Sequence, residues 1–133
     1  MNKRGFTLIE LLAVIVILAI IALIATPIIL GIINDARDEA KARSAELVYA
    51  GVEYAYTTSL YKNTEGSVMT TPTLADINSN LTIDNMETHE VKNGVLTIVT
   101  EDDVTCTVTA ANDGYVVECG DYLDATTMEV ATK

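Results

Sequence analysis

An apolar run near the N-terminus constrains this chain more than any other feature. No charged residue lies between Leu11 and Ile33, and a helix of that length, rising about 1.5 Å per residue, can cross the hydrocarbon core of a bilayer. Lys3 and Arg4 are the only charges ahead of Glu10. The positive-inside rule therefore places the N-terminus in the cytoplasm and the rest of the chain outside. We predict a single-pass protein of the cytoplasmic membrane with an external head.

A secretory signal peptide also has a basic start and an apolar middle, but its cleavage site needs small residues at A-x-A spacing after the run. The triplets Ile20-Ile21-Ala22 and Leu23-Ile24-Ala25 carry a bulky residue where that site needs a small one. We therefore expect the apolar segment to stay on the mature protein.

Glu10 is the one acidic residue at the start of this segment. A carboxylate at membrane depth costs a few kcal/mol, so such groups are usually paired and functional. The alternative is that Glu10 only marks the membrane interface, since it lies near the cytoplasmic end of the run.

The N-terminal residues resemble a known family. Lys3-Arg4-Gly5-Phe6-Thr7-Leu8-Ile9-Glu10, followed by an apolar span with Pro27 in its second half, is similar to the class III signal sequence of type IV pilins and pseudopilins. The resemblance covers about the first third of the chain. It implies that a prepilin peptidase cuts between Gly5 and Phe6 and methylates the new N-terminus at Phe6. It also implies that Glu10 pairs with the Phe6 amine of a neighbouring subunit during assembly.

This resemblance implies a structural protein and not an enzyme: a subunit of a type IV pilus. Its partners would be other copies in a helical filament, the prepilin peptidase, a pilus assembly ATPase and an inner platform protein. After assembly it would form a cell-surface filament for adhesion, twitching motility or biofilm, without a cofactor. One alternative is a pseudopilin of a type II secretion or DNA-uptake system. Another is a membrane-anchored enzyme or adhesive module whose N-terminus is coincidental.

The predicted parts are a cleaved leader (1–5), a transmembrane and polymerisation helix (6–33) and a globular head (34–133). Within the head we expect the second half of the helix at 34–61, a loop and short helix at 62–85, an antiparallel sheet at 86–119 and a C-terminal tail at 120–133. Without Lys3 and Arg4 the chain keeps 6 basic against 19 acidic residues, a formal net charge of −13. Nucleic-acid binding is not expected, because it relies on basic residues that neutralise phosphates.

One long helix from about Phe6 to about Leu60 is the simplest reading of the first half of the chain. Pro27 cannot donate a backbone hydrogen bond and Gly31 adds backbone freedom, so we expect a bend or local unwinding there. Farther along, an apolar stripe with helical spacing predicts the face that packs on the head; it consists of Ala45, Val48, Val52, Ala55 or Tyr56, and Ser59.

The rest of the head reads as β structure, so the predicted fold is α+β: a long N-terminal helix with a four-stranded antiparallel meander on its second half, as in type IV pilins. The expected strands are 86–91, 95–100, 104–110 and 115–119, separated by turn residues such as Asn93-Gly94. Before them, Pro72-Thr73-Leu74-Ala75-Asp76-Ile77 predicts a short helix capped by Thr73.

Alternation in the third strand predicts the register with the fourth. A turn centred on Asn112 and Asp113 places Ala110 opposite Tyr115, Val108 opposite Val117, and Cys106 opposite Cys119. Outside the cytoplasm, two cysteines predict one disulfide, Cys106–Cys119. Two buried free thiols are the alternative.

The sequence shows no catalytic motif and no metal-ligand spacing, so no metal is predicted. The single histidine, His89, lies on a predicted strand without a nucleophile partner and reads as a packed or edge residue. The C-terminal acids Asp113, Glu118, Asp121 and Asp124 read as solvated. A calcium site is the alternative, because major pseudopilins carry calcium near their C-terminus, but no EF-hand pattern supports it.

Overall fold

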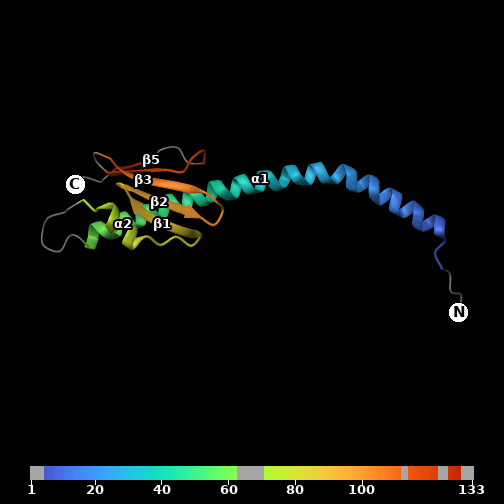
Figure 1. Ribbon diagram of the computed structural model, residues 1–133, viewed down its shortest axis with the longest axis horizontal. Helices are drawn as coiled ribbons and strands as arrows, with labels where there is room; N and C mark the ends of the chain where they lie inside the picture. Colours follow the sequence, from blue (N-terminus) through green and yellow to red (C-terminus); the bar gives the residue numbers. More distant parts are fainter. Residues whose placement is uncertain (1–4, 63–70, 112–113, 123–125, 130–133) are drawn as a thin grey trace. The chain divides into compact units, whose positions relative to one another are not determined.

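The protein is described here by a computed structural model, which covers residues 5–62, 71–111, 114–122 and 126–129 (Figure 1). The chain divides into two compact units, residues 1–38 and 39–133, and each is described by itself. One helix, α1, passes from the first unit into the second; it spans Leu8–Lys62.

In the first unit, α1 is an apolar helix whose side chains are almost all exposed. It is long and apolar enough to cross a membrane. The helix runs through Pro27 and Gly31 without interruption, although Pro27 has no amide to donate to the carbonyl of Leu23. The hydroxyl of Thr26 donates to the carbonyl of Ala22 at 2.7 Å. A bend or unwinding at Pro27 and Gly31 stays a prediction.

In the second unit, α1 buries one stripe of small and β-branched residues. All the positions expected to face the head are buried; they are Ala45, Val48, Val52, Ala55, Tyr56 and Ser59. On the exposed side, Arg43 forms an ion pair with Glu39 one turn earlier. The prediction of one long helix with a packing stripe in its second half is confirmed.

A short second helix, α2, spans Leu74–Asn80. Thr73 caps it: its hydroxyl accepts from the Asp76 amide at 3.3 Å, and the Asp76 carboxylate accepts from the Thr73 amide at 2.9 Å. This reciprocal capping box satisfies two amides that the first helical turn leaves without partners. The predicted cap is confirmed.

The sheet is an antiparallel meander in the order β1-β2-β3-β4-β5. The strands are β1 Met86–Lys92, β2 Val95–Thr100, β3 Thr105–Ala111, β4 Gly114–Glu118 and β5 Thr126–Glu129. The α+β layout of the type IV pilin fold is confirmed, and β1 to β4 are the four predicted strands. We placed residues 120–133 in a tail, whereas β5 extends the sheet by pairing with β4. Thr-Thr-Met-Glu is too short and too polar to predict a strand alone, so pairing with the edge of β4 decides its conformation.

Local turn chemistry and side-chain alternation agree in this sheet. Asn93 and Gly94 join β1 to β2 with φ angles of 53° and 77°, as a two-residue hairpin turn requires. Between β3 and β4, Val108 lies opposite Val117 and Ala110 opposite Tyr115. The predicted register is confirmed; its turn residues, 112–113, lie outside the described residues.

The core lies between the second half of α1 and the inner face of the sheet (Figure 1). Tyr56 of α1 meets Tyr115 of β4 edge to face, with ring centroids 5.5 Å apart. The Tyr115 hydroxyl donates to the carbonyl of Pro72. Burial raises the pKa of Tyr56, and burial together with the charges of Tyr56 and Asp76 raises the pKa of Tyr115.

Candidate functional site: the N-terminal segment

The first turn of α1 is closed by Thr7 and Glu10. The Glu10 carboxylate accepts from the Thr7 amide at 2.9 Å and from the Thr7 hydroxyl at 3.1 Å. In return the Thr7 hydroxyl accepts from the Glu10 amide at 3.3 Å. Thr7 is thus the N-cap of α1 and Glu10 the third helical residue, a capping box. It sets the start of the helix two residues after Phe6.

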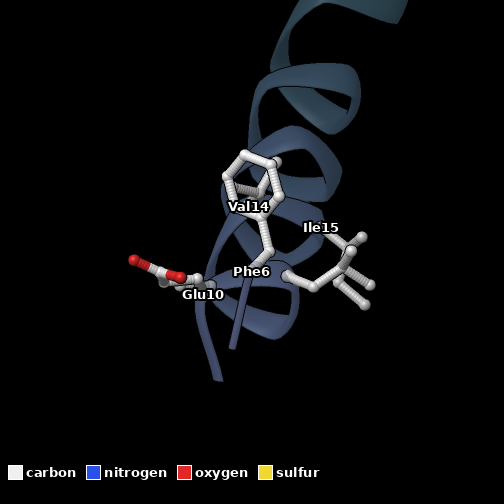
Figure 2. A pocket seen from close by; sticks show the side chains of 6 residues that line it. Phe6, Glu10, Val14 and Ile15 are labelled. Atoms are coloured by element: carbon white, nitrogen blue, oxygen red, sulfur yellow. The ribbon is translucent and has the colours of Figure 1, made fainter. Parts of the chain in front are cut away.

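Phe6 precedes this cap and is 90% exposed. Together with Glu10 and the apolar side chains of the next turns it lines an open, shallow groove (Figure 2). The Glu10 carboxylate points away from the helix on another side than Ile15 (Figure 2). The site is therefore a single carboxylate at the border of an exposed apolar surface.

A comparison with protein-family models finds the prokaryotic N-terminal methylation motif over residues 1–26. The chain therefore carries the N-terminal motif of a type IV pilin-like prepilin. Searches of curated proteins and of solved structures give no match.

The motif implies processing by a prepilin peptidase and assembly into a filament, and it points to a structural subunit. The motif and the apolar first half of α1 fit a membrane-anchored pilin before assembly. The matched residues include Gly5, Phe6 and Glu10, and the structure places Gly5 in open surroundings, with no atom within 4 Å of where a Cβ would lie. Gly31 is equally open.

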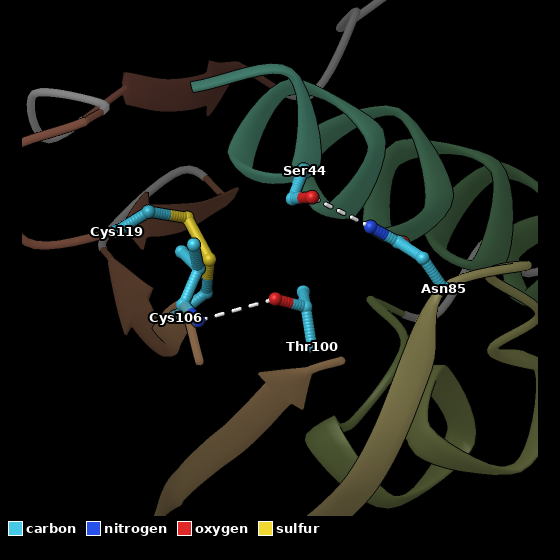
Figure 3. The surroundings of a disulfide bond; sticks show 6 residues. Ser44, Asn85, Thr100, Cys106 and Cys119 are labelled. Atoms are coloured by element: carbon cyan, nitrogen blue, oxygen red, sulfur yellow. Dashed lines mark hydrogen bonds between the residues drawn. A yellow bond between two sulfur atoms is a disulfide. The ribbon is translucent and has the colours of Figure 1, made fainter. Parts of the chain in front are cut away.

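In the head of the prepilin, a disulfide joins Cys106 of β3 to Cys119, directly after β4 (Figure 3). Both cysteines are fully buried and their Cα atoms lie 4.1 Å apart. The pairing follows the register of the two strands. It links the end of β4 to the core just before the turn at 120–122.

A polar cluster next to the disulfide joins α1 to two loops. The hydroxyl of Ser44 donates to the Asp102 carboxylate at 2.6 Å. The same hydroxyl accepts from the Asn85 side-chain amide at 2.8 Å (Figure 3). Asn85 precedes β1, and Asp102 lies in the acidic turn after β2. The buried hydroxyl of Thr100 accepts from the Val104 amide across the same turn. This arrangement fixes the ends of β1 and β2 on the helix.

His89 lies exposed on the edge strand β1, where its Nδ1 is 2.6 Å from the Asn78 side-chain oxygen of α2. The prediction of an edge residue is confirmed. Within residues 5–62, 71–111, 114–122 and 126–129, no group of three metal-ligating side chains comes together. Asp113 and Asp124, two of the four acids considered for calcium, lie outside the described residues.

Sequence reasoning missed the role of Thr7. The signal was available, because Thr-x-x-Glu directly before an apolar run is a capping box, but Glu10 was interpreted as an intermolecular partner or as a marker of the membrane interface. The Ser44, Asn85 and Asp102 cluster had no local signal, since its members are 41 and 58 residues apart.

Proposed function

We propose that this prepilin is the structural subunit of a type IV pilus. The observation that carries the proposal is the first half of α1, an apolar helix surface exposed to its surroundings with one carboxylate, Glu10, in its first turn. A surface of this kind needs lipid before assembly and other copies of the helix afterwards. The head would lie outside the cytoplasm, where a buried disulfide is stable.

In this proposal the peptidase cuts between Gly5 and Phe6, and Phe6 becomes the methylated N-terminus. The cut converts the backbone amide nitrogen of Phe6 into a free amine, four residues before Glu10. Thr7 already bonds one oxygen of the Glu10 carboxylate, and a carboxylate has further acceptor positions. The Phe6 amine of a neighbouring subunit can therefore bind Glu10 without displacing Thr7, and this polar pair would hold apolar helices in register.

Mass spectrometry of the native protein tests the processing. We expect a mature chain that begins at methylated Phe6. A chain that retains residues 1–5, or one cut after Ala25, would refute the pilin proposal in favour of a membrane-anchored protein with a coincidental N-terminus.

The assembly role is tested with Glu10→Leu in cells that supply the peptidase, the assembly ATPase and the inner platform protein. The variant should insert into the membrane and be cleaved, but it should enter filaments much less than the wild type. Glu53→Leu, which removes an exposed carboxylate from the second half of α1, is the matched control and should assemble normally. Normal incorporation of Glu10→Leu would contradict the role of the carboxylate.

The same cells separate a pilin from a pseudopilin. Long surface filaments formed by this subunit and the assembly machinery alone would support the pilus. A short periplasmic assembly that secretion or DNA uptake requires would instead identify a pseudopilin.

A further inference from the structure

On the part of the chain that the structure describes, the outer face of the sheet carries no charged side chain along β2 and β3. Its residues are partly exposed valines and threonines on three adjacent strands, which we call the threonine-valine face; they are Val95, Thr97, Val99, Thr107, Thr109 and Val116. The second half of α1 covers the opposite face, where Leu96, Ile98 and Val108 are buried (Figure 1). Neighbouring positions alternate between the two faces, as the pleat requires.

This neutral face is unusual on a chain whose predicted mature form carries a formal net charge of −13. Two copies of such an acidic head repel each other over most of their surfaces. Threonine and valine methyl groups can be brought together without bringing carboxylates together. A second copy of the chain is therefore the occupant that this face suits best.

The rim of the face supplies a specific charge pattern. Glu90 and Lys92 of β1 lie on the outer face, because their partners in β2 are Thr97 and Val95 while Val91 between them pairs with the buried Leu96. Their Cα atoms are about 7 Å apart along the strand. Among the described residues neither side chain takes part in an ion pair within the subunit.

Two rows cross the face side by side. One is Lys92, Val95, Thr109 and Val116, and the other is Glu90, Thr97, Thr107 and Glu118. Two copies can lie with these faces against each other, related by a two-fold axis midway between the two sheets. If that axis runs parallel to the rows, and so perpendicular to the strands, it exchanges the two rows. Each Glu90 then lies opposite Lys92 of the partner subunit, and Thr107 opposite Thr109 of the partner subunit. An axis parallel to the strands would instead bring Glu90 opposite Glu118, so the charges select the first arrangement.

We propose that the threonine-valine face joins two heads in an isologous contact between neighbouring filaments. An isologous contact closes on itself, whereas the subunits of one helical filament are related by repeated head-to-tail contacts. A two-fold contact of this face therefore links subunits of different filaments and bundles them. The inference rests on the proposed function, since it requires that the chain form filaments.

The test uses the full-length chain, expressed with the assembly machinery, and filaments sheared from cells. Bundling is measured as the fraction pelleted at low speed and by counting aligned filaments in negative-stain electron microscopy. In Glu90→Lys and in Lys92→Glu we expect the pelleted fraction to fall about tenfold, because each weakened contact is repeated along two filaments. The double swap, Glu90→Lys with Lys92→Glu, should restore bundling, because it re-forms both opposite-charge pairs.

Asp84→Lys is the matched control, since it makes the same charge change as Glu90→Lys at an exposed loop residue. It should bundle at least as well as the wild type. If only the general repulsion between acidic heads controlled bundling, Glu90→Lys would also bundle better than the wild type. Our expectation is the opposite. Wild-type filaments that stay single would overturn the inference, and so would bundling that Glu90→Lys leaves intact. A double swap that does not restore bundling, or single substitutions that abolish the filaments themselves, would also overturn it. Absence of wild-type filaments would overturn the proposed function as well.

Discussion

Thr7 and Glu10 bond each other reciprocally in the first turn of α1, so a carboxylate that lies within the matched N-terminal motif is also part of the helix cap. The cap lies directly after the residue at which the predicted cut is made. One sequence segment therefore carries an address for processing and the start signal of the helix that remains after it.

The cap can be tested with Thr7→Val. Loss of an N-cap side chain costs ~1 kcal/mol, which raises the equilibrium constant for opening of the first turn about fivefold. Hydrogen exchange of the Glu10 amide, measured in detergent micelles, should accelerate by this factor. Thr7→Ser keeps the hydroxyl and should exchange like the wild type. If the Glu10 amide exchanges at the same rate in Thr7→Val as in the wild type, the bonds between Thr7 and Glu10 do not stabilise the first turn.

The disulfide should contribute measurably to the stability of the head. In the chain-entropy model a loop closed over 13 residues contributes about 3 kcal/mol. Replacing both Cys106 and Cys119 by Ala should lower the free energy of unfolding by roughly that amount, as followed by urea denaturation of the detergent-solubilised chain. Reduction of the wild type should give the same loss. Two free thiols in the native protein, detected by alkylation, would contradict the bond.

Gly51 is required by the close approach of Ile83. A Cβ at position 51 would lie 2.4 Å from Cγ1 and 3.0 Å from Cδ1 of Ile83. Overpacking of this kind destabilises a protein by about 1–3 kcal/mol. This exceeds the ~1 kcal/mol by which alanine stabilises a helix relative to glycine. Gly51→Ala should therefore destabilise the wild-type head.

In an Ile83→Ala background the same substitution should stabilise the head, because the obstructing atoms are gone and the helical preference of alanine remains. A double-mutant cycle by urea denaturation measures this reversal. If Gly51→Ala has the same sign in both backgrounds, the contact with Ile83 is not the reason for glycine.

The buried tyrosine pair should limit stability at high pH. The folded-state pKa values of Tyr56 and Tyr115 lie above the ordinary value of 10.0. Between the unfolded and folded pKa values the native state binds more protons, so its stability falls as pH rises. We expect constant stability up to about pH 10 and a decline above it.

Unfolding free energies measured across this range check the decline, and Tyr115→Phe should reduce its slope. Tyr61→Phe is the control, because that side chain is 84% exposed. Absorbance titration should show that Tyr56 and Tyr115 ionise above the ordinary pKa of 10.0. Ionisation of this pair at the ordinary pKa would contradict its burial.

Much of the fold could be predicted because its signals are local. Helical spacing identified the buried stripe of α1, Asn93-Gly94 identified a hairpin, and alternation in β3 set its register with β4. Each of these depends on the geometry of a few consecutive residues. The match of the N-terminal motif likewise lies within one continuous segment, residues 1–26.

Contacts between distant segments could not be predicted in this way. Ser44 meets Asn85 and Asp102, and Gly51 meets Ile83, only because α1 lies against the loops that flank β1 and β2. β5 exists because β4 offers an unpaired edge, not because its own residues favour a strand.

The sequence by itself determined the apolar helix, its single carboxylate and the processing motif, because periodicity, charge and capping act within a few residues. Only the tertiary structure decided which side of the sheet the helix covers and which side stays open. The rows of the threonine-valine face are assembled from three strands and a rim on a fourth, so their pattern exists only once those strands have paired.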